Sequence, residues 1–143
     1  MEMQVNNLFV FVYGTLRREC KTGANRKYLH DAMFISPAKI RGVLYLIDYY
    51  PGLCLDTVKT KEDDKHQSGW VTGEIFLLKD TAQLNRLDEY EGCSSTFSQP
   101  REYVRMQVNV TLPQQQTRSV WTYIYIGDTS DLPLIASGDF LQD

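Results

Sequence analysis

Apolar stretches with the composition of β-strands alternate with short polar segments along most of this chain. Residues 5–13 are almost continuously hydrophobic, which is typical of a strand that is covered on both faces and lies centrally in its sheet. Further strands are predicted over residues 38–48, 53–58 and 70–78. Within the last of these, Gly73 indicates a β-bulge or a close approach by another segment.

Polar segments between these strands predict turns and loops. Pro51 and Gly52 are the residues that a type II turn requires, because proline suits its second position and glycine its third. Residues 59–69 contain no apolar side chain and mix both signs of charge. This composition predicts a solvated loop.

The last third of the chain predicts a β-hairpin. Residues 101–110 and 118–126 alternate between apolar and polar side chains and flank the polar segment 111–117. The C-terminal segment that follows, residues 131–143, is expected to form one irregular helical turn. Three apolar side chains would dock this turn on the domain: Leu132, Leu134 and Phe140.

Two short helices complete the pattern, over residues 23–32 and from about residue 81 to 91, because their apolar side chains recur at helical spacing. Many strands with only two or three short helices indicate an α+β domain built on a mixed, strongly curved sheet or a small barrel. A chain of 143 residues without an internal repeat has the ordinary length of one domain. We therefore expect residues 1–143 to form a single domain.

Charge and cysteine content exclude several classes of function. The net charge is −3 and the basic residues are scattered, so we expect neither a nucleic acid nor a membrane as partner. Cys20, Cys54 and Cys93 are far apart, which argues against a disulfide framework and a structural zinc site and favours the cytoplasm. The apolar stretch 8–12 is too short for a signal peptide and has no basic residue before it.

An acidic residue falls on the apolar face of the second predicted helix. Asp80 or Thr81 can cap the start of this helix, Gln83 matches the capping-box partner of Asp80, and Gly92 is the usual stop. At about 100° per residue, Glu91 lies in angle between two leucines of the apolar stripe, at positions 84 and 87.

Burial of a carboxylate is unfavourable unless it is protonated or finds partners. The negative end of the helix dipole would further raise the pKa of Glu91, toward the value of a general base at neutral pH. The alternative is that the last turn frays and Glu91 turns into solvent. Glu89 is expected to point to water on the opposite side of the helix, with Asp88 at the edge of the apolar stripe.

A second candidate feature is the abrupt end of the first strand at Tyr13 and Gly14. If Gly14 adopts a positive φ, the backbone N–H groups of Gly14, Thr15 and Leu16 form a concave site for an oxyanion. The alternative is a plain strand end with a tight turn. We do not expect Thr15 to be a nucleophile, because no nucleophile-elbow motif surrounds it.

Six motifs in this order resemble the gamma-glutamylcyclotransferase family, in its AIG2-like branch, and the resemblance runs from about residue 8 to 140. The motifs are FVYGTLR, YYPGL, GEIFLL, LDEYEG, YVR and WTYIY. The resemblance implies a small mixed β-barrel flanked by short helices. It also implies that residues Tyr13, Gly14, Thr15 and Leu16 bind substrate through their backbone and that Glu91 is the catalytic acid/base.

Other matched positions carry weaker expectations. Tyr103 matches a position that borders the pocket and contacts the ligand, although an ordinary strand tyrosine remains an alternative. Asn25, Trp121 and Tyr125 also match positions typical of the family, where a structural role is at least equally expected. Two arginines, Arg17 and Arg18, could neutralise a substrate carboxylate or could simply be solvated, and Arg101 could lie near the exit of the pocket.

The reaction implied by the resemblance converts a γ-glutamyl compound into 5-oxoproline and releases an amine or an amino acid, with no metal or cofactor. Thr15 stands where serine is commoner in the family, and the segments 59–69 and 113–117 look longer than in compact relatives, so the choice of substrate stays open. A non-enzymatic binding or interaction module on the same fold is the alternative. The sequence does not indicate an oligomeric state.

Overall fold

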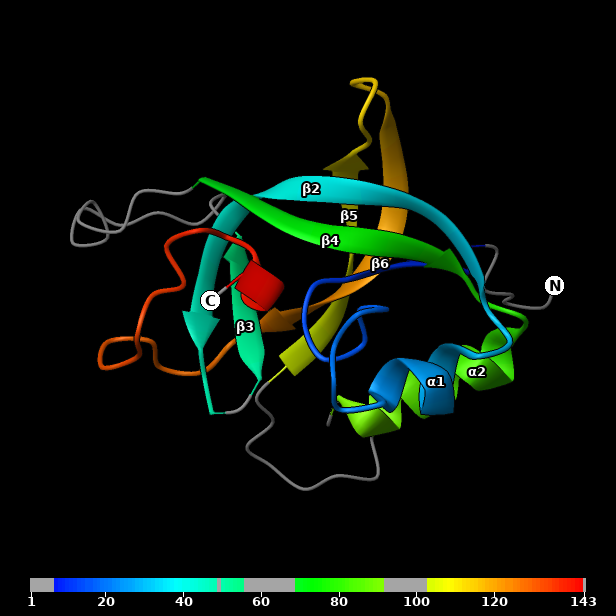
Figure 1. The fold of residues 1–143 in the computed structure, drawn as a ribbon, viewed down its shortest axis with the longest axis horizontal. Coiled ribbons are helices and arrows are strands. Elements are labelled where there is room, and N and C mark those ends of the chain that lie inside the picture. The colour runs from blue at the N-terminus through cyan, green and yellow to red at the C-terminus, as the bar shows by residue number, and fades with distance from the viewer. Residues whose placement is uncertain (1–6, 49, 56–68, 92–102, 143) are drawn as a thin grey trace, which may run out of the picture.

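The computed structural model describes residues 7–48, 50–55, 69–91 and 103–142. Six strands, two α-helices and one short 3₁₀ helix make up this part of the chain (Figure 1). Their bounds are β1 Phe9–Val12, α1 Ala24–Leu29, β2 Met33–Leu46, β3 Pro51–Leu55, β4 Gly69–Leu77, α2 Thr81–Tyr90, β5 Tyr103–Thr111 and β6 Thr117–Tyr125, followed by the 3₁₀ helix Phe140–Gln142.

Five of the strands close into a mixed barrel. Strand β1 pairs antiparallel with β4, β4 with β2, and β2 with β3, while β3 and β1 both pair in parallel with β6. Strand β5 is additional: it forms the predicted hairpin with β6 and touches β2 at one pair, Lys39 and Thr111. The predicted α+β class and small mixed barrel are confirmed.

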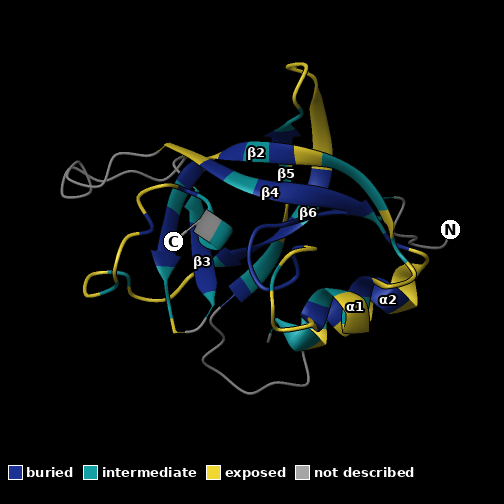
Figure 2. Cartoon of the chain, in the orientation of Figure 1, coloured by how far each residue is buried: buried dark blue, intermediate teal, exposed yellow. Residues whose placement is uncertain are grey.

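Strand β1 is central, as its continuous hydrophobicity predicts, because it lies between β4 and β6. Its side chains alternate between two cores. An inner core within the barrel includes Phe11, Tyr13, Leu53, Ile75 and Val120. An outer core between the barrel wall and the helices includes Val10, Val12, Phe76, Leu84 and Leu87. In Figure 2, buried residues are found on the strands of the barrel and on the helices, whereas the tip of the hairpin and several loops are exposed.

The two helices lie side by side against one side of the barrel (Figure 1). Helix α2 begins with the predicted cap, because the Asp80 side chain accepts a hydrogen bond from the N–H of Gln83 at 2.9 Å. Gln83 does not complete a capping box. Its Oε1 accepts from the N–H of Lys79 at 2.6 Å, and its side-chain amide donates to the carbonyl of Tyr28 at 3.0 Å, which ties α2 to α1.

Gly73 permits a close approach of strands rather than forming a bulge. A Cβ atom at this position would lie 2.4 Å from the carbonyl oxygen of Val12 and 2.5 Å from the ring of Phe11. The register between β2 and β4 is regular through Gly73 and shifts instead between Phe34 and Ser36. The barrel wall at this position therefore requires glycine for lack of space.

The predicted type II turn at Pro51 and Gly52 is wrong. Both residues belong to β3, where Gly52 pairs with Tyr45, and the chain reverses just before them through a hydrogen bond from Ile47 N–H to the carbonyl of Tyr50 at 3.0 Å. Gly52 does not have a positive φ. Glycine is required there because a Cβ would lie 2.8 Å from the Cβ of Tyr125 across the sheet.

Two further boundaries differ from the prediction. Strand β2 begins at Met33 rather than near residue 38, since its bulge and Pro37 obscure the alternation of side chains. In the C-terminal segment, Leu134 is 42% exposed, and Ile135 takes its place in the inner core. The helical turn itself is the 3₁₀ helix Phe140–Gln142. Predictions that concern residues 5–6, 56–68 and Gly92 lie outside the described residues.

We expect Gly73→Ala to lower the free energy of unfolding by about 1–3 kcal/mol, because the new methyl group meets backbone and a buried ring. Gly69→Ala is the matched control: it lies on the same strand, is exposed and has open space around its position. Urea denaturation of both variants measures the difference. Equal stability of the two variants would contradict this account of Gly73.

Candidate active site

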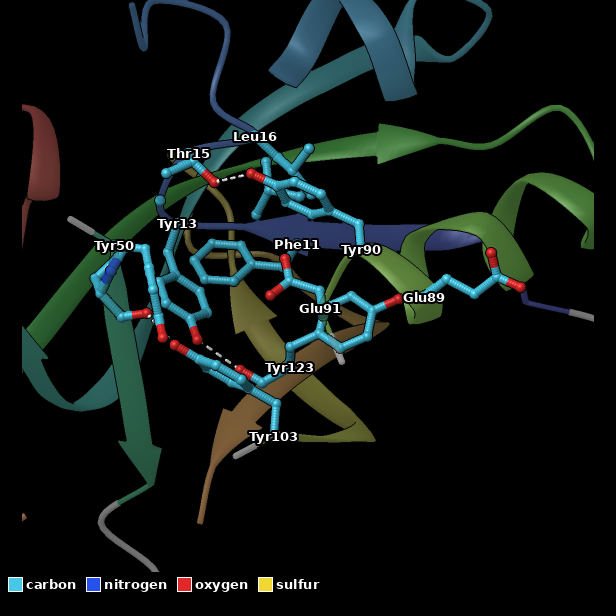
Figure 3. A pocket seen from close by; sticks show the side chains of 13 residues that line it. Phe11, Tyr13, Thr15, Leu16, Tyr50, Glu89, Tyr90, Glu91, Tyr103 and Tyr123 are labelled. Carbon is cyan, nitrogen blue, oxygen red and sulfur yellow. Dashed lines mark hydrogen bonds between the residues drawn. The ribbon is translucent and has the colours of Figure 1, made fainter. Parts of the chain in front are cut away.

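A cavity of about 290 Å³ lies where β1 ends, beside the C-terminal end of α2 and the start of β3 (Figure 3). Segments far apart in the sequence line it together. They are residues 11–16, Tyr50 and Pro51, the end of helix α2 at residues 89–91, Tyr103 and Tyr123. All six predicted site residues, Tyr13, Gly14, Thr15, Leu16, Glu91 and Tyr103, are thus brought to one cavity.

Gly14 adopts no positive φ, so the reason given for this glycine from the sequence is wrong. A Cβ at this position would lie 2.6 Å from Cγ and 2.7 Å from Cδ of Pro51. The glycine therefore lets the loop after β1 lie directly against the first residue of β3. This contact joins positions 14 and 51, and no local sequence pattern could have indicated it.

Residues 14–17 form a tight turn, in which the N–H of Arg17 donates to the carbonyl oxygen of Gly14 at 3.0 Å. Because the carbonyl and the following N–H of a trans peptide point in opposite directions, the N–H of Thr15 points away from this hydrogen bond. No hydrogen bond joins the N–H groups of Gly14, Thr15 or Leu16 to any residue that the structure describes. These donors can serve an oxygen atom of a ligand in the cavity.

Helix α1 and the segment before it donate hydrogen bonds to backbone carbonyl groups of the same loop. The side-chain amide of Asn25 donates to the carbonyl of Leu16 at 2.8 Å, and the hydroxyl of Thr22 donates to that of Thr15 at 3.4 Å. These contacts direct both carbonyl groups to the α1 side, so the N–H of Leu16, which follows the carbonyl of Thr15, points the other way. Asn25 is therefore a structural support of the loop.

Glu91 follows the last residue of α2 and still has helical geometry, with φ −85° and ψ −2°. Its N–H donates to the carbonyl of Leu87 at 2.9 Å, so the helix does not fray before this position. The Glu91 carboxyl points into the cavity toward Phe11, while Glu89 points away on the other side of the helix (Figure 3). The helical periodicity of residues 81–91 predicted the directions of both side chains.

The Glu91 carboxyl is enclosed by protein although the residue as a whole is only partly buried. No hydrogen bond joins it to any described residue. Burial of the carboxyl, with a smaller contribution from the negative charge of Asp88, raises the pKa of Glu91 from 4.5 to about 8. The direction and the main cause, burial, agree with the prediction from the sequence, but the second cause is Asp88 rather than the helix end.

Asp88 connects the end of α2 to the hairpin. Its Oδ1 accepts a hydrogen bond from the hydroxyl of Tyr123 at 2.8 Å and lies 3.1 Å from Nε of Arg105. Burial, followed by the charge of Asp88, raises the pKa of the Tyr123 hydroxyl, so this group remains a proton donor. The guanidinium of Arg105 also lies 4.4 Å above the ring of Trp121.

The hydroxyl groups of the predicted tyrosines support the cavity wall. Tyr103 donates to the carbonyl of Pro51 at 2.7 Å. Tyr13 donates to the carbonyl of Tyr123 at 2.6 Å and accepts from the N–H of Leu53 at 3.1 Å, so it bridges β6 and β3. Both rings face the cavity while both hydroxyls hold strands together.

Arg17 and Arg18 do not line the cavity. Arg17 is buried, and Nη1 lies 2.6 Å from the carboxylate of Asp139 while Nε lies 3.5 Å from that of Glu74. The Arg18 N–H donates to Glu74 at 3.0 Å, and its guanidinium lies 3.6 Å above the ring of Phe34. These contacts anchor the end of the loop. Neither Glu74 nor Asp139 was predicted from the sequence, because nothing local marks either residue as buried. Arg101, the third predicted arginine, lies outside the described residues.

No group of three or more His, Cys, Asp or Glu side chains in the described ranges is arranged to hold a metal ion. Within the same ranges, no helix is both long and apolar enough to cross a membrane.

Comparison with known proteins identifies the family. The family model described as "Gamma-glutamyl cyclotransferase, AIG2-like" matches residues 10–142, which is nearly the whole chain. The chain belongs to the AIG2-like gamma-glutamyl cyclotransferase family. Among curated relatives, the gamma-glutamylcyclotransferase family protein YtfP of Escherichia coli K12 is 30% identical over 134 residues, which cover 93% of this chain and 96% of YtfP.

Solved structures of the gamma-glutamyl cyclotransferase family have the same fold. The solution structure of ytfP from Escherichia coli matches with a TM-score of 0.61 and 28% identity over 93% of this chain and 96% of that chain. An AIG2-like protein from Mus musculus matches with a TM-score of 0.63 and 23% identity over 89% of this chain and 84% of that chain. The barrel with one extra strand and two short helices is therefore the fold of the family.

The buried acid of this family member should make its stability depend on pH. Because the pKa of Glu91 is higher in the folded than in the unfolded state, its protonated form favours folding, and this stability is lost as pH rises from about 4.5 to 8. Glu91→Gln carries no ionisable group. We expect this variant to exceed the wild type in free energy of unfolding at pH 9 by up to about 5 kcal/mol, with no gain near pH 4.

Urea denaturation between pH 4 and 9 measures this difference. The exposed Glu89 provides the control, because Glu89→Gln should not change the pH dependence. A Glu91→Gln variant that tracked the wild type at every pH would show that the carboxyl is solvated.

Proposed function

We propose that this protein is a gamma-glutamyl cyclotransferase that converts a γ-glutamyl amide into 5-oxoproline and a free amine or amino acid. The observation that carries the proposal is the position of one enclosed carboxyl, that of Glu91, in the same cavity as three N–H groups that have no acceptor among the described residues. Membership of the family supports the same reaction class.

The reaction is an attack of the substrate's α-amine on its own γ-carbonyl carbon. The amine must lose a proton before it can attack, and the flexible glutamyl chain must bend so that nitrogen and carbon meet. Positioning of two reacting groups can lower a barrier by roughly 7–11 kcal/mol at best. In this proposal, the loop at residues 14–16 holds the bent chain through its N–H groups.

Glu91 acts as the acid/base in the proposed reaction. Its carboxylate takes one proton from the substrate ammonium, and the freed amine attacks the γ-carbonyl to close a five-membered ring. N–H groups of the loop then stabilise the oxyanion, typically by about 3 kcal/mol for each good donor. Glu91 returns the proton to the departing nitrogen, the C–N bond breaks, and the second ring N–H proton leaves to the released amine or to water.

We expect Glu91→Gln to lower kcat for 5-oxoproline formation by about 10²–10⁴-fold, since the amide keeps the shape of the side chain but cannot accept the proton. Glu89→Gln, with its side chain directed away from the cavity, should retain activity close to that of the wild type. Release of 5-oxoproline from γ-glutamyl amino acids and γ-glutamyl amines measures both variants.

Near wild-type turnover by Glu91→Gln would refute the assignment of the base. Binding of these compounds by calorimetry without any turnover would instead favour a binding module.

The pH dependence provides a separate test. Because the base must be ionised, kcat/KM should rise with pH along an acid limb near pH 8. Asp88→Asn removes the negative charge that helps to raise the pKa of Glu91, so the acid limb should move to lower pH. The asparagine Oδ1 can still accept the hydrogen bond from Tyr123. An acid limb that stays in place in this variant would contradict the role given to Asp88.

A further inference from the structure

One hydrogen bond connects the two halves of the cavity. The Oγ1 atom of Thr15 and the hydroxyl oxygen of Tyr90 lie 2.7 Å apart, although the two residues are 75 positions apart in the chain (Figure 3). Thr15 is the central one of the three loop residues that line the cavity and whose N–H groups have no acceptor among the described residues. Tyr90 directly precedes Glu91. The bond therefore joins the loop donors to the helix end that carries the acid.

The other contacts of the loop lead elsewhere. Its carbonyl groups accept hydrogen bonds from Thr22 and Asn25. Gly14 lies against Pro51 of β3. Arg17 forms ion pairs with β4 and with the C-terminal segment. The hydrogen bond of Thr15 with Tyr90 joins the loop to helix α2. A change in this bond would therefore alter the separation of loop and acid without releasing the loop from α1 or the barrel.

The Tyr90 ring is itself held in place. It packs against the ring of Tyr28 on α1, with ring centroids 4.6 Å apart and planes tilted by 42°. Contacts of this kind restrict the ring and present its hydroxyl to Thr15 from a fixed position. Thr15 has a β-branched side chain with few accessible rotamers, so its hydroxyl is restricted as well.

We propose that the hydrogen bond between Thr15 and Tyr90 sets the distance between the loop N–H groups and Glu91, which makes both side chains positioning residues. The inference rests on the proposed cyclotransferase reaction. It assigns the Thr15 side chain a role that differs from that of its backbone: the N–H serves the ligand, whereas the hydroxyl serves the helix end. A displacement of about 1 Å between reacting groups can reduce a rate by about 100-fold.

The test is a cycle of two single variants and their double variant. Thr15→Val and Tyr90→Phe each remove one hydroxyl and keep the shape of the side chain. We expect each to lower kcat by about 10- to 100-fold with a smaller change in KM, and the double variant to be no slower than the slower single variant, because both remove the same bond.

Two further variants serve as controls. Thr15→Ser keeps the hydroxyl and should retain most of the wild-type kcat. Tyr28→Phe removes a hydroxyl from the ring packed against Tyr90, and this hydroxyl has no hydrogen bond to a described residue, so kcat should stay close to that of the wild type. Melting temperatures should differ from that of the wild type by only a few degrees, as expected for the loss of one hydrogen bond.

A second measurement does not depend on activity. In NMR spectra of the unliganded protein, Thr15→Val and Tyr90→Phe should both shift the amide resonances of residues 14–16 and of Glu91, and Thr15→Ser should shift them much less. Unchanged resonances in both variants, or rate losses that multiply in the double variant, would overturn the inference. If the wild type turned over no γ-glutamyl compound, the proposed function would fail, and the amide resonances alone would decide the positioning role.

Discussion

The enclosure of one carboxyl group at the end of a helix is the constraint on which this site depends. A carboxyl that has no hydrogen-bond partner among the described residues is retained away from water only where surrounding packing is strong enough to hold it there. That packing comes from Leu84 and Leu87, which are fully buried and set the rotation of α2. The same two leucines that stabilise the outer core therefore direct Glu91 into the cavity, where burial and the charge of Asp88 raise its pKa.

Closure of the barrel supplies the other side of the site. Strands β1 and β3 both pair in parallel with β6, but β1 pairs at Trp121 and β3 at Ile124, and this stagger places the end of β1 beside the start of β3. Gly14 and Pro51 then lie in direct contact. Tyr13 and Tyr103 hold this junction with hydrogen bonds to strand backbone. The cavity is thus a consequence of strand closure, and its aromatic lining also stabilises the barrel.

Charged residues outside the cavity have a supporting role. Arg17 lies between two carboxylates, those of Glu74 and Asp139, and this buried cluster ties the loop to β4 and to the C-terminal segment. Removing one partner of such a cluster leaves an uncompensated charge in the interior, so the burial of each of these three residues depends on the other two. The loop after β1 is consequently held from four sides: α1, α2, β3 and the charged cluster.

Much of this could be predicted from local patterns. The period of the apolar residues in 81–91 placed Glu91 on the buried face, Asp80 marked the helix start, and the composition of 5–13 indicated a central strand. The roles of three residues were misinterpreted because each depends on a partner 37 to 89 positions away. Gly14 lies against Pro51, Gly52 against Tyr125, and Leu134 pairs with Tyr45. Periodicity is a relation between neighbouring residues, so it can be read from the sequence. The free space around a residue, its charge partners and the shared cavity arise only when distant strands close into a barrel.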